Sequence, residues 1–329
     1  MKSNRCSKSM ERAQYLEYIQ KTLDEAVSKA RQNVEGSPAD YIPELANVDP
    51  DQVSASIQLV DGTQLSSGDY QLHIFTLQSV AKLISLIGLM EEYGEEKMFS
   101  WIHVEPSGQS FSSISQVDRY GAIPVNPMVN AGAIALCSRI PGNTQQRAQW
   151  LDNWAAKLFG HTLAVNGKVF ASERATGDRN RSIAYLLKSK QELGLSVEDS
   201  LETYFYLCSY ESEVKSSAYL PMLLANGGLA PDGTRVISER TSNSVVAIMA
   251  TCGMYDESGI NLVKTGMPAK SGVSGVVVAL ATGRGGMAVC SPRLNDKGGS
   301  VRAQQILVHI SQELDWHFAA PWGYMRQKS

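Results

Sequence analysis

The sequence has little of what marks a metal site or a disulfide framework. Its five histidines lie far apart, and no C-x-x-C, H-x-H or H-E-x-x-H pattern occurs in the 329 residues. Such patterns are common signatures of bound metal, so we expect no metal site. The cysteines are odd in number, scattered and mostly inside apolar runs: Cys6, Cys137, Cys208, Cys252 and Cys290. We interpret them as buried thiols of a reducing compartment.

A strong net charge and long apolar runs are also missing. The net charge is -3, which gives no electrostatic reason to expect nucleic acid or an anionic membrane as a partner. No run of eighteen apolar residues occurs, so we expect no membrane span. The first twenty residues are basic but lack the apolar region of an export signal, which favours a cytoplasmic protein.

What is present is an ordinary globular composition, 43% hydrophobic and 19% charged, in a clear order of elements. Residues 53–69 alternate apolar and polar side chains around Asp61-Gly62, which predicts a hairpin. A strand is expected at 71–76, and two β-rich runs at 272–283 and 285–292 precede a closing helix at 301–316. From about 96 to 230 the pattern is helical and loop-rich. Helices are expected at 1–35, 126–140, 145–160, 180–194, 200–210, 216–228 and 240–253.

Strands at both ends of the chain indicate one mostly antiparallel sheet with helices packed on it, an α/β (α+β) fold. The predicted domains are a sheet domain formed by residues 1–77 and 235–329 and a mainly helical insert formed by 78–234. The active site is expected between them.

The stretch Leu72–Met90 carries the first chemical motif, Ser79-x-x-Lys82. It begins as a β-rich run and continues with apolar residues at helical spacing. Residues three apart share one face of a helix, so the hydroxyl and the amine can meet. Serine needs a base to act as a nucleophile, and a lysine in apolar surroundings can be neutral enough to serve. The N–H groups and dipole of a helix N-terminus would favour an oxyanion beside Ser79.

The S-x-x-K motif occurs a second time, and a related motif, K-[ST]-G, occurs twice. A second S-x-x-K, Ser212 to Lys215, stands in a polar stretch where the lysine should stay solvated and protonated. K-[ST]-G occurs at Lys264 and again at Lys270. S-x-x-K together with K-[ST]-G is the signature of penicillin-binding proteins and β-lactamases. We favour the Lys270 copy because it runs directly into an apolar strand, although a glycine-rich edge strand with exposed lysines is the plain alternative. The Lys264 copy has no explanation in the sequence.

Longer blocks make the resemblance specific: the chain resembles the serine-dependent, β-lactamase-related glutaminases, amidohydrolases of bacteria and mitochondria. Matching blocks occur in the family order between about 41 and 276. They are YIPELA (41–46), FTLQSVAK (75–82), NPMVNAGAI (126–134), SERATGDRN (172–180), YFYLCS (204–209), LANGG (224–228), CGMYD (252–256) and GMPAKSGVSGV (266–276).

The resemblance implies roles for particular residues. Ser79 would be the nucleophile, Lys82 the general base, and Tyr255 a proton relay to the leaving ammonia. The backbone N–H groups of Ser79 and Val273 would form the oxyanion hole. The substrate's amino-acid head group would be held by Tyr41, Asn130, Glu173, Asn180 and Tyr204, and Ser79, Tyr255 and Val273 would also contact the substrate. Lys270 is not the base in this family.

The residue types also suit free glutamine, which carries an ammonium, a carboxylate and a neutral amide. Glu173 can bind the ammonium, while Asn130, Asn180 and tyrosine hydroxyls can donate to the carboxylate. Each residue also has a plain structural interpretation: Asn180 could cap a helix, and Glu173 could be a solvated surface acid. Gly177, between these two, favours a loop.

The resemblance therefore implies a β-lactamase-like fold and hydrolysis of L-glutamine to L-glutamate and ammonia through an acyl-enzyme. It implies no metal or organic cofactor, and a homodimer or homotetramer. Two alternatives remain open. One is a penicillin-recognising acyl-serine hydrolase, which should be exported and carry an S-x-N motif. The other is a catalytically silent amino-acid sensor on the same scaffold.

Overall fold

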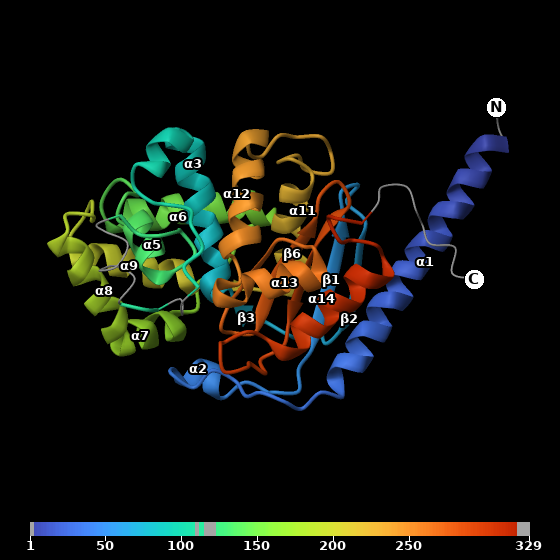
Figure 1. Cartoon of the computed structure of the whole chain (residues 1–329), viewed down its shortest axis with the longest axis horizontal. Helices are drawn as coiled ribbons and strands as arrows, with labels where there is room; N and C mark the ends of the chain where they lie inside the picture. The colour runs from blue at the N-terminus through green and yellow to red at the C-terminus, as the bar shows by residue number, and fades with distance from the viewer. Residues whose placement is uncertain (1–2, 109–111, 115–122, 321–329) are drawn as a thin grey trace.

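The computed structural model describes residues 3–108, 112–114 and 123–320, with side chains described from Arg12 onward. The molecule has two lobes (Figure 1). A sheet with the first and last helices forms one lobe, and a group of helices from the middle of the chain forms the other. Among the described helices, none combines the length and apolar character needed to cross a membrane.

The sheet joins the two ends of the sequence. Its five strands are β1 (Ser54–Leu59), β2 (Gln64–Gly68), β5 (Ala269–Ser271), β6 (Val276–Ala281) and β7 (Gly285–Cys290), in the order β2-β1-β7-β6-β5. All neighbours are antiparallel, and Ser54 of β1 lies opposite Cys290 of β7. The predicted hairpin is confirmed: its turn contains Gly62 with a φ of 90°, a conformation that suits glycine. The expected mostly antiparallel sheet is confirmed as well.

Helices cover both faces of the sheet, which is why β6 and β7 are buried along their whole length. Alternate side chains serve the two sides: Val277 and Ala279 share a core with α1 (Ser3–Arg31) and α14 (Val301–Glu313). Val276 and Val278 belong to the larger core, which includes α11 (Tyr219–Ala225). This double burial explains why the sequence there is an unbroken apolar run without alternation.

The helical lobe is built around α3 (Lys82–Phe99), whose first nine residues, 82–90, are all buried. The helices α5 (Asn130–Cys137) and α6 (Thr144–Phe159) pack against α3. Beyond them, α8 (Asp178–Ser189) and α9 (Val197–Cys208) pack against α5, and α7 (Gly167–Thr176) packs against α9. The helix α12 (Glu239–Cys252) contacts both α3 and β5 and so links the lobes. The division into two domains remains a prediction; α10 (Val214–Ser217) and α11, from the predicted insert, pack against strands of the sheet.

Several local expectations need correction. The strand expected at 71–76 is only β3 (Phe75–Thr76), and it pairs with β4 (Glu211–Ser212) outside the main sheet. Lys270 lies on a short strand of its own, because residues 272–275 turn before β6 begins. The single helix expected at 216–228 is two short helices, α10 and α11. The helix end at Gly160 is confirmed, with the left-handed φ of 77° that glycine adopts easily.

The expected buried thiols are confirmed for the four cysteines whose side chains the structure describes. These are free and buried: Cys137, Cys208, Cys252 and Cys290. The remaining short elements are α2 (Pro43–Ala46), two 3-10 turns, η1 (Gln78–Ala81) and η2 (Tyr255–Glu257), and α13 (Ser258–Thr265).

Candidate active site

Ser79 and Lys82 lie where the turn η1 becomes helix α3. Ser79 is inside the turn and Lys82 is the first residue of the helix, so the two are separated by three positions, about one helical turn. Gln78, directly before Ser79, is not glycine and yet has a φ of 47°. Strained backbone of this kind is concentrated at functional sites, where the surrounding structure maintains it.

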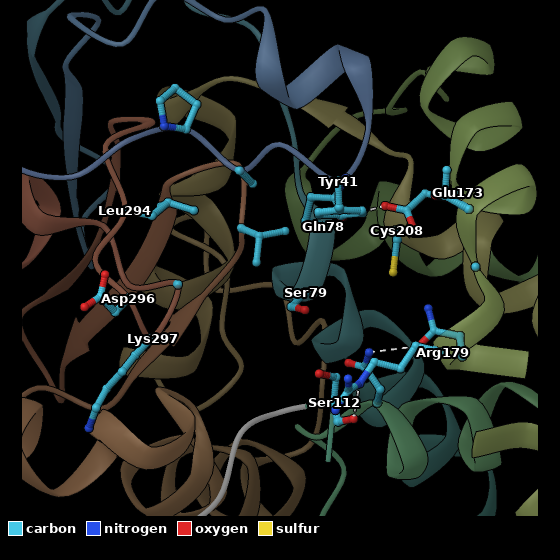
Figure 2. A pocket seen from close by; sticks show the side chains of 18 of the residues that line it. Tyr41, Gln78, Ser79, Ser112, Glu173, Arg179, Cys208, Leu294, Asp296 and Lys297 are labelled. Atoms are coloured by element: carbon cyan, nitrogen blue, oxygen red, sulfur yellow. Dashed lines mark hydrogen bonds between the residues drawn. The ribbon is translucent and has the colours of Figure 1, made fainter. Parts of the chain in front are cut away.

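A cavity of about 710 Å³ opens at Ser79. Figure 2 shows Ser79 between two groups of side chains, with Tyr41, Glu173 and Arg179 on one side and Asp296 and Lys297 on the other. The cavity is lined by most of the residues that the sequence singles out: Tyr41, Ser79, Asn130, Glu173, Asn180, Tyr204 and Val273. Lys82 and Tyr255 are not on the cavity wall, but Lys82 bonds to Asn130 and the side chain of Ser79 affects the pKa of Tyr255.

The amine of Lys82 lies in an apolar, water-poor position and is 1% exposed. Its Nζ donates to the carbonyl of Met128 at 2.9 Å and to Oδ1 of Asn130 at 2.8 Å. Burial disfavours the charged form and lowers the pKa of Lys82 to about 8. A neutral amine has two N–H groups, and these two acceptors satisfy both. Its lone pair then remains for a proton.

A chain of amide side chains connects Lys82 to the far wall. Asn130, the first residue of α5, accepts from Lys82 and donates through Nδ2 to Oδ1 of Asn180 at 2.9 Å. Asn180 lies inside α8 and not at its N-cap, which is Gly177. Among the described residues, Nδ2 of Asn180 has no acceptor, so this donor is available to a ligand.

Gly177 divides two helices where the sequence favours a loop. It ends α7 and begins α8, so Glu173 and Asn180 are both helical. A Cβ at this position would lie 2.5 Å from the ring of Phe205 on α9, so only glycine allows this close packing. The break turns the two helices so that both side chains face the same cavity.

Glu173 is a buried acid, not a solvated one. It is 6% exposed, and its Oε1 accepts a hydrogen bond of 2.8 Å from the hydroxyl of Tyr41. Burial raises the pKa of Glu173, and this effect is larger than that of the hydrogen bonds from Tyr41 and Gln78, which lower it. A buried carboxylate with so few partners is suited to a cationic ligand group.

Tyr204 on α9 also lines this wall and lies close to the lysine. The residue is buried, which raises the pKa of its hydroxyl, and its ring centroid is 6.0 Å from Nζ of Lys82.

The opposite wall belongs to the sheet lobe. Tyr255, in η2, has a φ of 56°, the same kind of strained backbone as Gln78. Burial raises the pKa of the Tyr255 phenol, and the nearby Ser79 side chain lowers it by a smaller amount. In the described part of the chain, the backbone N–H groups of Ser79 and Val273 have no hydrogen-bond acceptor. These two N–H groups are therefore available to a ligand oxygen.

Gly272 brings the two lobes together at this point. A Cβ on Gly272 would lie 2.7 Å from the carbonyl oxygen of Leu77, two residues before Ser79. The glycine of this K-[ST]-G copy thus permits a close approach between backbones. The other copy has a different explanation: Lys264 lies in the last turn of α13, and Gly266 ends that helix with a φ of 59°. Lys-Thr-Gly there is a helix-termination signal.

The second S-x-x-K motif is structural. Ser212 lies on β4 and bonds to Ser217 at 2.9 Å, while Nζ of Lys215 lies 5.4 Å from the ring centroid of Tyr70.

The sequence reasoning missed several cavity residues, namely Gln78, Arg179, Asp296 and Lys297. Gln78 lies within the family block FTLQSVAK (75–82) and directly before Ser79, and this position in the sequence could have indicated a place in the site.

Fold and site together define a class: a β-lactamase-like α/β protein with a serine and a buried lysine one turn apart at a cavity between two lobes. The Glutaminase family model matches residues 36–318. A glutaminase of Legionella pneumophila is 51% identical over 300 residues, covering 91% of this chain and 97% of that protein. One of Clostridium tetani is 40% identical over 302 residues, covering 90% and 98%.

Solved structures agree. A structure described as the probable glutaminase ybaS has a TM-score of 0.90 and 32% identity, covering 93% of this chain and 99% of that one. A Bacillus glutaminase has a TM-score of 0.82 and 32% identity, covering 90% and 98%. The chain belongs to the glutaminase family.

Proposed function

We propose that this protein hydrolyses L-glutamine to L-glutamate and ammonia through a covalent glutamyl-enzyme. The observation that carries the proposal is the fully buried Lys82, one turn from Ser79, whose pKa is lowered to about 8 by burial. Family membership supports the reaction, and a related structure titled as Mglu in its glutamate form supports the ligand class.

In the proposed mechanism, Oγ of Ser79 attacks the side-chain amide carbon while neutral Lys82 takes its proton. The oxygen of the tetrahedral intermediate lies between the N–H groups of Ser79 and Val273. When the C–N bond breaks, Tyr255 passes a proton to the departing nitrogen and ammonia leaves. Water then attacks the ester carbon, and glutamate is released.

The head group is recognised on the helical wall. Glu173 binds the α-ammonium, and the desolvation that raises its pKa is offset by this new partner. Asn180, Asn130 and the hydroxyl of Tyr204 bind the α-carboxylate and fix the orientation of the substrate, while Tyr41 keeps its hydrogen bond to Glu173.

The decisive experiment measures ammonia release from L-glutamine by wild type and by Ser79→Ala, with L-asparagine as second substrate. Turnover by wild type and its loss in the variant by at least about 10³-fold are expected. Near wild-type turnover by Ser79→Ala would refute the mechanism.

The same preparation tests the two alternatives. A sensor would show a higher melting temperature with glutamine but release no ammonia. Stoichiometric labelling of Ser79 by a fluorescent penicillin would favour the penicillin-recognising hydrolase.

Assembly into a homodimer or homotetramer and a cytoplasmic location remain predictions. Light scattering coupled to gel filtration measures the first.

A further inference from the structure

A second lysine, Lys270, lies beside the site and has no part in the steps above. It is on β5 at the edge of the sheet and is 0% exposed. Its Nζ donates to the hydroxyl oxygen of Tyr255 at 3.0 Å and to the carbonyl of Ser271 at 2.6 Å. The amine also lies 4.1 Å from the centroid of the Tyr255 ring.

Packing alone does not explain a lysine at this position. Burying an amine costs free energy, and a methionine of similar length would fill the space without that cost. No carboxylate forms a salt bridge with Lys270 within the described ranges. Nζ of Lys82 is 5.6 Å from the same Tyr255 ring, so two buried amines face one phenol. Burial, and then the charge of Lys82, lowers the pKa of Lys270.

The hydrogen bond has a directional consequence. A phenol oxygen carries one proton and accepts through its lone pairs. Because Lys270 donates to that oxygen, the O–H bond of Tyr255 must point elsewhere. The side chain of Ser79, which lines the cavity, interacts with the phenol and lowers its pKa, so the phenol oxygen lies next to the proposed nucleophile.

We propose that Lys270 is a positioning residue that acts through Tyr255 on departure of the leaving group. Its N–H holds the phenol oxygen, directs the O–H toward the departing nitrogen, and stabilises the oxygen as the proton leaves. The C–N electron pair stays on nitrogen, which takes the Tyr255 proton. Tyr255 is reprotonated by the proton that Lys82 took from Ser79, so the step is balanced. This inference rests on the proposed glutamine hydrolysis.

The test compares two leaving groups in Lys270→Met and Tyr255→Phe. Ammonia needs a proton to depart, whereas the nitrophenolate of a γ-glutamyl 4-nitrophenyl ester does not. We expect Lys270→Met to lower kcat for glutamine about 100-fold, within the range of general acid–base effects. With the ester we expect a loss below about threefold, with KM nearly unchanged for both substrates. The double variant should match Tyr255→Phe alone within about twofold, because both changes remove one function.

Equal losses with both substrates would overturn the proposal, and so would losses that multiply in the double variant. Lys270→Gln keeps an N–H donor and should retain more glutamine turnover than Lys270→Met, so it serves as a second variant if Met impairs folding. Lys264→Met, outside the site, is the matched control. Failure of the proposed function itself would appear separately, as glutamine turnover that survives Ser79→Ala.

Discussion

The two walls of the cavity are built in different ways. On the helical wall, side chains from separate segments bond to one another: Asn130 to Asn180, and Glu173 to Tyr41 from the segment before α2. The sheet wall contributes a backbone group and buried side chains. These are the N–H of Val273, which has no acceptor among the described residues, Tyr255 with its strained backbone, and the buried Lys270 that bonds to Tyr255.

The difference suggests a division of labour. The helical wall offers an acid and several amide donors, which match the charged head group of an amino acid and should govern binding. The sheet wall offers groups that act on a forming oxyanion and a departing nitrogen, and should govern kcat. Ser79 and Lys82 lie between the walls and should serve the chemistry alone.

The largest effect should come from Lys82→Met, which removes the base but keeps an apolar chain of similar length. We expect kcat to fall about 10³- to 10⁴-fold with KM changed less than about fivefold. Steady-state ammonia release measures both constants, and thermal melting checks that the fold survives. A large rise in KM with kcat preserved would mean that Lys82 serves substrate binding and not the chemical step.

Much of this architecture could be predicted from local signals, and the failures share one cause. The Asp61-Gly62 hairpin and the Ser79–Lys82 spacing are set by residues close in sequence, and the structure shows both. The pairing of β3 with β4 depends on residues more than a hundred positions apart, which no local pattern encodes.

The site shows the same limit. The residue types for an amino-acid head group could be read from the sequence, but the burial of Lys270 could not. That burial depends on β5 packing beside η1, and local spacing says nothing of such a contact. The roles of the site residues remain predictions that the variants described here test.

Glu173→Gln changes the helical wall and should therefore affect substrate binding. The amide keeps an oxygen for the Tyr41 hydroxyl but loses the charge that pairs with the substrate ammonium. We expect KM for glutamine to rise about 100-fold with kcat changed much less, since loss of one partner of a buried charge pair costs several kcal/mol. The matched control is Glu202→Gln, whose carboxylate pairs with Arg174 on the protein surface. A loss confined to kcat would contradict the division between walls.

The pH dependence should separate the two groups without mutation. Because the pKa of Lys82 is about 8, the fraction of neutral Lys82 decreases as pH falls. We therefore expect kcat/KM to drop about tenfold per pH unit below pH 8 and to level off above it. Glu173 differs from Lys82 because protonation removes its charge. As pH falls through the raised pKa of Glu173, the carboxylate becomes neutral, can no longer pair with the substrate ammonium, and KM should rise. Rate profiles from about pH 5 to 10 measure both. A flat profile between pH 6 and 9 would mean that Lys82 is not the titrating base.

The smallest effect should come from Lys264→Gln, which tests whether the two K-[ST]-G copies have been assigned correctly. Lys264 is exposed in the last turn of α13, and a cation there favours the helix through the dipole by less than about 1 kcal/mol. We therefore expect kcat and KM within twofold of wild type and a slightly lower melting temperature. The Lys270 copy differs because its lysine is enclosed and bonded to Tyr255. A tenfold loss of activity in Lys264→Gln would show that the end of α13 is coupled to the sheet wall, and the contrast between the two copies would fail.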